Sequence, residues 1–549
     1  MTASEELIFL SLGGAGEIGM NLTLYGYRGE WLMIDCGITF ADDRQPGLDV
    51  LMPDPGFIVE RRDRLAGLVV THGHEDHIGA IPYLWQRFRC PVYATPFARA
   101  LLYEKLVEAG LQNEVAITEV PLSGRFTVGP FEIELITLTH SIPEPNAVVL
   151  RTPLGVVLHT GDWKLDPEPL VGPTADAAAL RRLGGEGVLA MVCDSTNALR
   201  PGRSGSEADV RAALIDLIGR YEQRVAVACF ASNVARLESI AAAGAAHDRN
   251  VALIGRSLWR IYKAARDAGY LQDVAPFLSE DEAGYLPRGK ALLVCTGSQG
   301  EPRSALSRIA QGDHPHIVLE PGDAAIFSSR QIPGNERAIG RLQNRLAKAG
   351  VIVVTDSEHP IHVSGHPARD ELIEMYQLVR PRIAIPVHGE ARHLIAHAAL
   401  ARECQVPETV VAENGALVRL APGPASVVGE VAVGRLALDG TQLRPLGSTA
   451  LKSRQRMIHD GAAVATVVLD KAGQLLAAPK VTVRGVMDEA EEGAAEALGS
   501  AVGDAIGALS PAERRDDEAV REAARLAVRR SLKASYGKRP VTDIHIVRI

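Results

Sequence analysis

Several patterns that mark large classes of protein are missing from this sequence. Its six cysteines are scattered, and no two of them form a CxxC pair. Single thiols inside apolar segments behave as small hydrophobic side chains, which argues against a disulfide framework and predicts a cytoplasmic location. No basic head followed by an apolar core opens the sequence, and no apolar run reaches the length of a membrane span. We therefore expect neither export nor a membrane partner.

Excess positive charge is also missing. Lys and Arg number 58 against 67 Asp and Glu, a formal net charge of −9, whereas proteins that bind nucleic acids usually carry at least a local excess of cations. Two basic segments are candidates for local charge. The segment Arg256–Arg266 interleaves cations with Trp and Tyr, which suits base stacking and core packing equally well. The residues Arg337, Arg341, Arg345 and Lys348 are spaced along one helix face, where a solvated surface is the favoured interpretation.

The composition that remains is that of an ordinary globular protein, with 46% hydrophobic and 23% charged residues over 549 positions. Such a length exceeds what one hydrophobic core supports, so two or three domains are expected. Function must then be sought where chemically capable side chains gather.

The densest such cluster is His72-Gly-His74-Glu-Asp76-His77. It follows the apolar run Leu65–Val70 and precedes a helical pattern, so it lies at a predicted strand-to-helix junction. Three imidazoles and a carboxylate at such a junction can direct several metal-binding atoms into one small space. Without a cation or hydrogen bonds the same groups would lose solvation, which makes a chance cluster the weaker interpretation.

Further candidate ligands end other apolar strands. His140, Asp162, Asp194 and His388 each follow such a run, and Asp35 closes another. Taken singly, a buried acid or histidine at a strand end is more often a satisfied core group. Because strand ends bring distant parts of an α/β chain together, the whole set predicts one shared site. Other histidines lack this context and are interpreted as structural: His159, His314, His316, His393 and His397.

A glycine-rich segment near the amino terminus offers a rival interpretation. Gly14-Ala-Gly-Glu-Ile-Gly19 follows an apolar run, and Asp35 lies near the spacing of a dinucleotide-binding fingerprint. However, Asn21–Tyr27 alternates with period two and Arg28-Gly-Glu30 is typical of a turn. A hairpin is therefore expected in place of a crossover helix, which argues against nucleotide binding.

The His72 to His77 cluster resembles the HxHxDH motif of the metallo-β-lactamase superfamily, and the later strand ends match that superfamily's other ligands in order. Between Asp194 and His388 lies a long segment with its own α/β pattern, an arrangement that resembles the β-CASP nucleases. Asp194, His366 and His388 match motifs A, B and C of that family. The glycine-rich segment and Thr296–Pro302 are similar to the ribonuclease J family in particular.

The resemblance implies an α/β fold: a metallo-β-lactamase αββα sandwich, an inserted β-CASP α/β domain and a small α+β carboxy-terminal domain. The expected domains are 1–200 (metallo-β-lactamase, first part), 201–354 (inserted β-CASP), 355–440 (metallo-β-lactamase, second part), 441–460 (linker) and 461–549 (carboxy-terminal). The last domain holds no clustered catalytic groups, so a scaffold or dimerisation role is expected. RNA contact through Arg525, Arg529, Arg530 and Lys533 is the weaker option.

The resemblance also implies a two-zinc centre, with manganese or magnesium as possible substitutes. His72, His74 and His140 would hold one ion, Asp76, His77 and His388 the other, and Asp162 both. Asp35 would orient a ligand histidine without touching metal. Two divalent ions about 4 Å apart can activate water and neutralise a phosphoryl group, which leads to phosphodiester hydrolysis.

The implied catalytic residues are Asp76, Asp194 and His366. We assign His366 as proton donor to the departing ribose oxygen, with Asp194 orienting it, although the two roles could be exchanged. Ser232 and Asn233 follow a strand, and Ser364-Gly365 precedes His366. With His366 these residues could cradle the 5′ monophosphate of RNA. The alternative for Ser232 and Asn233 is capping of the helix that begins near residue 234, and the two are compatible.

The function expected from this resemblance is a zinc-dependent ribonuclease in RNA maturation and decay, digesting RNA 5′-to-3′ from 5′-monophosphate ends and also cutting internally. A homodimer or homotetramer is expected, with RNA as the substrate partner. One alternative is a small-molecule hydrolase of the same superfamily, a thioesterase or lactonase, which would not need an inserted domain. The other is an inactive RNA-binding scaffold, against which the intact ligand set argues.

Overall fold

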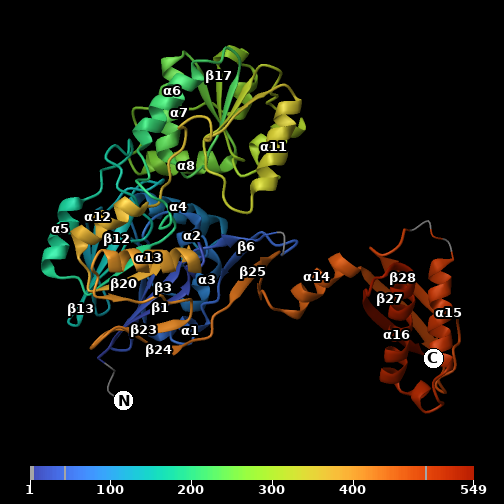
Figure 1. Cartoon of the computed structure of the whole chain (residues 1–549). Helices are drawn as coiled ribbons and strands as arrows, with labels where there is room; N and C mark the ends of the chain where they lie inside the picture. Colours follow the sequence, from blue (N-terminus) through green and yellow to red (C-terminus); the bar gives the residue numbers. More distant parts are fainter. Residues whose placement is uncertain (1–4, 43–44, 489–490, 492) are drawn as a thin grey trace. The chain divides into compact units, whose positions relative to one another are not determined.

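The computed structural model (Figure 1) describes residues 5–42, 45–488, 491 and 493–549. The chain forms two compact units. One comprises Val50–Leu436 with the amino-terminal segment up to Phe40, and the other comprises Ala437–Ile549 with the short segment Ala41–Asp49. Within the described part of the chain, no helix is both long and apolar enough to cross a membrane.

The first unit contains an eight-stranded sheet in the order β24-β23-β1-β3-β4-β7-β8-β9. Its strands are β1 (Leu7–Gly13), β3 (Leu22–Tyr27), β4 (Glu30–Ile34), β7 (Leu65–Val69), β8 (Val92–Ala94), β9 (Ile117–Glu119), β23 (Ala416–Ala421) and β24 (Ser426–Glu430). Strands β3 and β4 pair antiparallel through a tight turn, with Tyr27 opposite Glu30. The predicted hairpin is confirmed, and the crossover helix that a dinucleotide-binding fold requires is replaced by strand β3.

From β4 to β9 the neighbouring strands run parallel. Helix α2 (Glu75–Ile78) and helix α3 (Ile81–Phe88) connect β7 to β8, and α4 (Pro96–Glu108) connects β8 to β9. The carboxyl end of β7 therefore opens directly into the His72 to His77 cluster.

A seven-stranded sheet faces the first, in the order β10-β11-β12-β13-β14-β20-β22. Its strands are β10 (Arg125–Val128), β11 (Phe131–Thr137), β12 (Asn146–Thr152), β13 (Gly155–His159), β14 (Ala190–Asp194), β20 (Ile383–Val387) and β22 (Glu408–Thr409). Phe9 and Leu32 of the first sheet share one buried core with Val148 and Ile385 of the second. This core holds the two sheets face to face.

Helices cover the outer face of the second sheet: α5 (Ala177–Glu186), α12 (Arg369–Val379) and α13 (Ala391–Glu403). Leu180, Met375 and Leu400 of these helices pack with Val149 and Met191 of the sheet. The predicted sandwich of helices around two sheets is confirmed.

The inserted segment forms a separate five-stranded parallel sheet in the order β16-β17-β15-β18-β19. Its strands are β15 (Val225–Ala228), β16 (Asn250–Ile254), β17 (Ala291–Cys295), β18 (Ala324–Phe327) and β19 (Ile352–Val354). The helices α6 (Glu207–Ile218), α7 (Val234–Ala246), α8 (Arg256–Asp267) and α11 (Glu336–Lys348) alternate with these strands. Such alternation of strands and helices produces a parallel sheet.

One strand expected in this segment is wrong. Ile317–Glu320 alternates buried and exposed residues, with Val318 56% exposed, yet it pairs with no strand. Its backbone groups bond to side chains instead, because Arg224 Nη1 donates to the Val318 carbonyl (2.6 Å) and the Ile317 N–H donates to His314 Nδ1 (3.2 Å). The alternation shows only that one face of the segment is buried. Both a paired strand and an extended, unpaired segment such as Ile317–Glu320 have this property.

The second unit contains the expected α+β fold. Its three-stranded sheet has the order β28-β27-β29, formed by β27 (Ala462–Leu469), β28 (Lys480–Arg484) and β29 (Val541–Arg548). Helices α15 (Ala494–Gly507) and α16 (Asp517–Tyr536) share a core with this sheet. The segment 441–460, expected as a linker, holds β26 (Gln442–Pro445) and helix α14 (Thr449–Asp460).

Candidate metal centre

One group of donor atoms forms around the loop after β7. His72 Nε2 lies 3.0 Å from His74 Nδ1, which lies 3.1 Å from His140 Nε2. Asp162 Oδ2 approaches His72 Nε2 to 4.0 Å and His140 Nε2 to 3.9 Å. The four side chains each offer one ligand atom, all within 4.8 Å of one another. This spacing is what a single cation between them requires.

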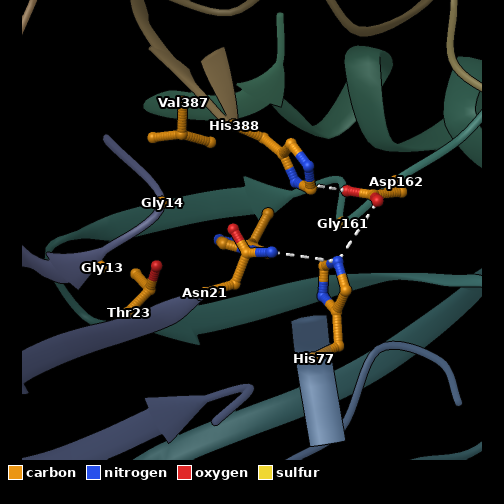
Figure 2. Close-up of a pocket in the computed structure, with 10 residues that line it drawn as sticks. Gly13, Gly14, Asn21, Thr23, His77, Gly161, Asp162, Val387 and His388 are labelled. Carbon is orange, nitrogen blue, oxygen red and sulfur yellow. Dashed lines mark hydrogen bonds and ion pairs between the residues drawn. The ribbon is translucent and has the colours of Figure 1, made fainter. Parts of the chain in front are cut away.

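A second group lies beside the first and shares Asp162 with it. His77 Nε2 is 3.2 Å from Asp162 Oδ2 and 3.6 Å from Asp76 Oδ2. His388 Nδ1 lies 2.8 Å from Asp162 Oδ1, and Figure 2 marks this contact with a dashed line. Asp76, His77, Asp162 and His388 again have ligand atoms within 4.8 Å of one another. The two oxygens of Asp162 thus face different imidazoles, an arrangement suited to a bridging carboxylate.

Asp35 lies behind this group. Its Oδ2 is 2.7 Å from His77 Nδ1 and accepts from Thr71 Oγ1 (2.8 Å), while its Oδ1 accepts from the Thr71 N–H (2.8 Å). Holding Nδ1 in this way turns His77 Nε2 toward Asp162. Asp35 therefore occupies the orienting position expected from the sequence, and Thr71 is a supporting residue that the sequence did not indicate.

The glycine-rich segment supports His388. Strand β2 (Ala15–Gly16) pairs with β21 (Gly389–Glu390), and the His388 N–H donates to the Gly14 carbonyl at 2.6 Å. Gly14 has φ +93°, and a Cβ there would lie 2.3 Å from Asn21 Oδ1. Only glycine fits this approach. Asn21 in turn places its Nδ2 3.1 Å from His77 Nε2 (Figure 2), so the segment that resembled a nucleotide motif shapes the metal centre.

A third group extends from the same carboxylate. His366 Nδ1 lies 2.8 Å from Asp194 Oδ2 and 3.9 Å from Asp162 Oδ2. Asp194 Oδ1 accepts from the N–H and Oγ1 of Thr196, at 2.8 and 2.7 Å. These bonds fix the carboxylate that faces His366, so the imidazole has one available orientation.

Gly365 connects His366 to the first group. Its carbonyl lies 2.6 Å from His140 Nδ1 and accepts its hydrogen bond when Nδ1 is protonated. A Cβ at Gly365 would lie 2.6 Å from His140 Cε1. Glycine is therefore required here by close packing against a candidate ligand.

The electrostatics of the first group favour neutral imidazoles. Burial lowers the pKa of His72 and His74 well below its usual value, and neighbouring imidazoles lower it further. Burial and the nearby His366 lower the pKa of His140 to about 3. Neutral imidazoles offer the lone pairs that cations bind.

In the other two groups, neighbouring opposite charges determine the direction of the pKa shifts of Asp162 and His366. Burial alone would raise the pKa of Asp162, but His388 and His77 hold it well below its usual value. Burial opposes the charged form of His366, yet Asp194 and Asp162 raise its pKa to about 9.

Two buried atoms between the ligand groups indicate whether a divalent cation fits there. Asp162 Oδ1 and His388 Nδ1 are shielded from solvent and have no hydrogen-bond partner, although they lie only 2.8 Å apart. Buried polar atoms rarely remain unsatisfied. Imidazole and carboxylate donors are those that zinc and similar divalent ions bind, so the residues present fit such ions.

The residues expected to bind a terminal phosphate come from two segments of the chain. Ser364, Gly365 and His366 adjoin the metal groups, and Ser364 Oγ accepts from Asn197 Nδ2 at 2.8 Å. Asn233 instead caps α7, because its side chain accepts from the Arg236 N–H at 2.9 Å. The capping alternative is therefore confirmed for Asn233. It is wrong for Ser232, which precedes the cap and is half-buried.

The basic segment with interleaved aromatics forms α8, and two of its cations form ion pairs with carboxylates of the protein. Arg260 and Lys263 form ion pairs with Glu108 and Glu104 of α4. These pairs join the inserted segment to the sandwich, so Arg260 and Lys263 have partners within the protein. The stripe Arg337, Arg341, Arg345 and Lys348 lies exposed along α11, as its favoured interpretation predicted.

The other histidines have structural partners. His397 lies between Ser195 Oγ and the Tyr376 hydroxyl, both at 2.9 Å. His159 Nδ1 is 3.1 Å from the Tyr25 hydroxyl. His314 Nδ1 accepts a hydrogen bond from the Ile317 N–H.

Four family models match consecutive parts of the chain. They are described as "Metallo-beta-lactamase superfamily" (residues 16–219), "Ribonuclease J, beta-CASP domain" (222–346), "Zn-dependent metallo-hydrolase RNA specificity domain" (350–411) and "Ribonuclease J C-terminal domain" (449–549). The second match covers most of the inserted five-stranded sheet, and the third covers β20 and β22, by which the chain returns to the seven-stranded sheet.

Similar proteins cover the chain from end to end. The protein named Ribonuclease J of Sinorhizobium meliloti is 45% identical over 100% of this chain and 98% of its own length. Ribonuclease J of Thermus thermophilus is 36% identical over 98% of this chain and 94% of its own. A crystal structure of a protein of unknown function from Enterococcus faecalis V583 shares the fold, with a TM-score of 0.51 and 16% identity over 75% of this chain and 100% of that one.

Proposed function

The chain belongs to the ribonuclease J family and is a metal-dependent ribonuclease, and we propose that it digests RNA 5′-to-3′ from 5′-monophosphate ends and also cuts internally, using two zinc ions. The observation that carries the two-ion proposal is Asp162, whose carboxylate belongs to both buried ligand groups. One ion would be held by His72, His74 and His140, and the other by Asp76, His77 and His388. Bound there, such ions activate water and offset charge on the phosphoryl group.

The remaining residues would position and protonate the reacting groups. Asp194 fixes Nδ1 of His366, which leaves Nε2 available to protonate the departing ribose oxygen. The bonds from Thr196 hold Asp194 in place for this task. Asp35 would act only through His77, since its contacts are with that imidazole and with Thr71.

Selection of the 5′ end would depend on residues that contact the terminal phosphate. Ser364 and Gly365, next to His366, would contact the terminal phosphate from one side, and Ser232 and Asn233 at the end of β15 from the other. Asn233 Nδ2 donates to Glu207 Oε1 at 3.1 Å, so its side chain would have to exchange this bond to reach a ligand. Equal digestion of triphosphate and monophosphate ends would rule the selection out.

A direct assay separates this function from its alternative. We expect the full chain to release mononucleotides from 5′-monophosphorylated RNA, with activity lost to a chelator and to Asp76→Asn. The matched control is Glu75→Gln, an exposed acid beside Asp76 that belongs to neither ligand group, and it should retain activity. Turnover of a generic thioester with RNA left intact would favour a small-molecule hydrolase instead.

We also propose that the protein assembles. A homodimer or homotetramer is expected, with the second unit as the scaffold, and light scattering of the full chain would give the mass. A monomer at micromolar concentration would contradict it.

A further inference from the structure

A buried carboxylate lies in the loop that follows His140. Glu144, between Pro143 and Pro145, is 4% exposed and has a φ of +59°, a left-handed conformation that residues other than glycine rarely adopt. Among the residues that the structure describes, Glu144 forms no ion pair, and burial raises its pKa. A strained backbone that directs an unpaired charge into the protein is costly, so the surroundings of Glu144 must stabilise it.

Two parts of the chain supply hydrogen bonds to this carboxylate. The Phe97 N–H donates to Glu144 Oε2 at 2.8 Å, and the Tyr270 hydroxyl donates to Glu144 Oε1 at 3.0 Å. Phe97 lies in the first turn of α4, whose N-cap residue Thr95 makes no side-chain capping bond, so Glu144 caps this helix in its place. Tyr270 belongs to the inserted segment and also packs edge-on against Phe97, with ring centroids 6.3 Å apart. One carboxylate therefore bonds both to the sandwich and to the inserted segment.

The main chain on either side of Glu144 leads to two candidate ligands. Glu144 follows His140 in the same loop. Asn146 Nδ2 donates to the Glu144 carbonyl at 2.6 Å, and the Asn146 N–H donates to the Thr71 carbonyl at 3.1 Å. Thr71 immediately precedes His72. A displacement of Glu144 would therefore be transmitted to His140 and His72, which both belong to the first ligand group.

Helix α4 packs against the same ligand group. Gly73 separates His72 from His74. A Cβ at Gly73 would lie 2.8 Å from Leu101 Cδ1 of α4 and 3.5 Å from Ile142 Cδ1. The loop and the helix are thus in close contact, and close-packed elements transmit displacement. Both the capped end of α4 and its packed face therefore influence the position of the first ligand group.

We propose that Glu144 is a positioning residue, which places the first ligand group correctly only while it is bonded to Tyr270 of the inserted segment. This role rests on the two-ion centre proposed above, and it makes the geometry of that centre depend on the position of the inserted segment. Without the Tyr270 hydroxyl, the carboxylate would lose one of two bonds that water cannot replace in a buried position. The loop after His140 and the first turn of α4 would then lose their fixed arrangement.

The experiment titrates full-length protein with Co²⁺ alone, which accepts the same imidazole and carboxylate ligands as zinc and whose visible absorption depends on the geometry of those ligands. Tyr270→Phe removes only the hydroxyl. Glu144→Gln keeps both bonds, because its amide oxygen can accept from the Phe97 N–H while its NH₂ donates to the Tyr270 hydroxyl. Glu144→Ala loses both bonds.

Two further variants are matched controls. Tyr285→Phe removes a hydroxyl from the inserted segment at a side chain that is 86% exposed. Lys263→Ala removes an ion pair between α8 and α4 and leaves Glu144 and Tyr270 unchanged. The second control separates a loosened contact between the two helices from an effect that passes through Glu144.

We expect Tyr270→Phe to weaken Co²⁺ binding at one of the two sites about 2- to 30-fold and to change the absorption spectrum, while Glu144→Gln matches the wild type. Glu144→Ala should weaken binding at least as much as Tyr270→Phe. On RNA at saturating zinc, kcat of Tyr270→Phe should fall more than KM rises, since the change acts at the metal centre and not on strand binding. Both controls should behave as the wild type.

Glu144 has no such role if Tyr270→Phe matches Tyr285→Phe in both Co²⁺ affinity and spectrum, or if Lys263→Ala changes them as much as Tyr270→Phe does. Urea unfolding shows whether each variant folds, and comparison of Glu144→Ala with Glu144→Gln gives the same test should Tyr270→Phe not fold. Failure of the proposed function is distinguishable, because RNA left uncut by zinc-loaded wild-type protein would not alter the Co²⁺ result.

Discussion

Asp35 contacts only one of the proposed metal ligands, His77. Replacing Asp35 with Asn tests whether this carboxylate nevertheless controls the metal centre. Three contacts converge on Asp35: the Thr71 N–H at 2.8 Å, Thr71 Oγ1 at 2.8 Å and His77 Nδ1 at 2.7 Å. Asn has the same size, but only its one oxygen can accept. With that oxygen facing the Thr71 N–H, the amide NH₂ would face His77 Nδ1 and Thr71 Oγ1.

Two buried contacts are then lost or reversed. Each buried donor left unsatisfied costs about 1–3 kcal/mol, so for two contacts the free energy of unfolding should fall by about 2–6 kcal/mol. The imidazole would also lose the partner that fixes its orientation, and loss of such a partner typically weakens metal binding about 10- to 100-fold. Activity on RNA at limiting zinc should fall in parallel and recover in part when zinc is added.

The assay is a zinc competition titration against a coloured chelator, together with urea unfolding. Asp63→Asn is the matched control, because the Asp63 side chain is 98% exposed and pairs only loosely with Arg62. The reasoning is refuted if the Asp35 variant binds zinc with wild-type affinity while remaining as stable as the control.

Three further predictions concern packing, the inserted segment and pH. Gly365→Ala should reduce activity strongly and stability by about 1–3 kcal/mol, because its Cβ would lie 2.6 Å from His140 Cε1; kinetics and urea unfolding measure both. Glu104→Lys and Lys263→Glu should each weaken the contact between α4 and α8, and the double reversal should restore it, as a double-mutant cycle in unfolding would show. Burial opposes ionisation of Glu134, but three arginines lower its pKa to about 2. The stability it contributes is present above the usual pKa near 4.5 and is lost as pH falls toward 2, so Glu134→Gln should flatten that part of the unfolding profile.

A different outcome would contradict each of these three predictions. Gly185 has open space around its Cβ position, so Gly185→Ala is the control, and equal effects at 185 and 365 would mean that His140 tolerates displacement. Coupling between the α4 and α8 charges that persists at about 1 M salt would not be an ion pair. A steep acid transition that is unchanged in Glu134→Gln would assign it to other carboxylates.

Much of the site could be predicted because each ligand ends an apolar strand. His140, Asp162 and His388 follow β11, β13 and β20 within a few residues, and Asp194 is the last residue of β14. Parallel or adjoining strands bring such ends together. The prediction of a strand over Ile317–Glu320 is wrong, because alternating burial does not require a pairing partner.

Other features depend on contacts between residues far apart in the sequence, which no local pattern contains. The glycine-rich segment could be separated from a nucleotide motif, but its bond to the His388 N–H could not be foreseen. Gly365 and His140 are 225 positions apart. The charges of α8 likewise gave no sign that their partners, Glu104 and Glu108, lie more than 150 positions earlier.

The proposed mechanism depends on a pair of cations that share Asp162. Crystals of the purified full-length protein, measured at wavelengths on either side of the zinc absorption edge, test it most directly. We predict two anomalous peaks, one among His72, His74 and His140 and one among Asp76, His77 and His388, each adjoining an oxygen of Asp162. A single peak remote from Asp162, or none in protein that degrades RNA in a chelator-sensitive way, would contradict it.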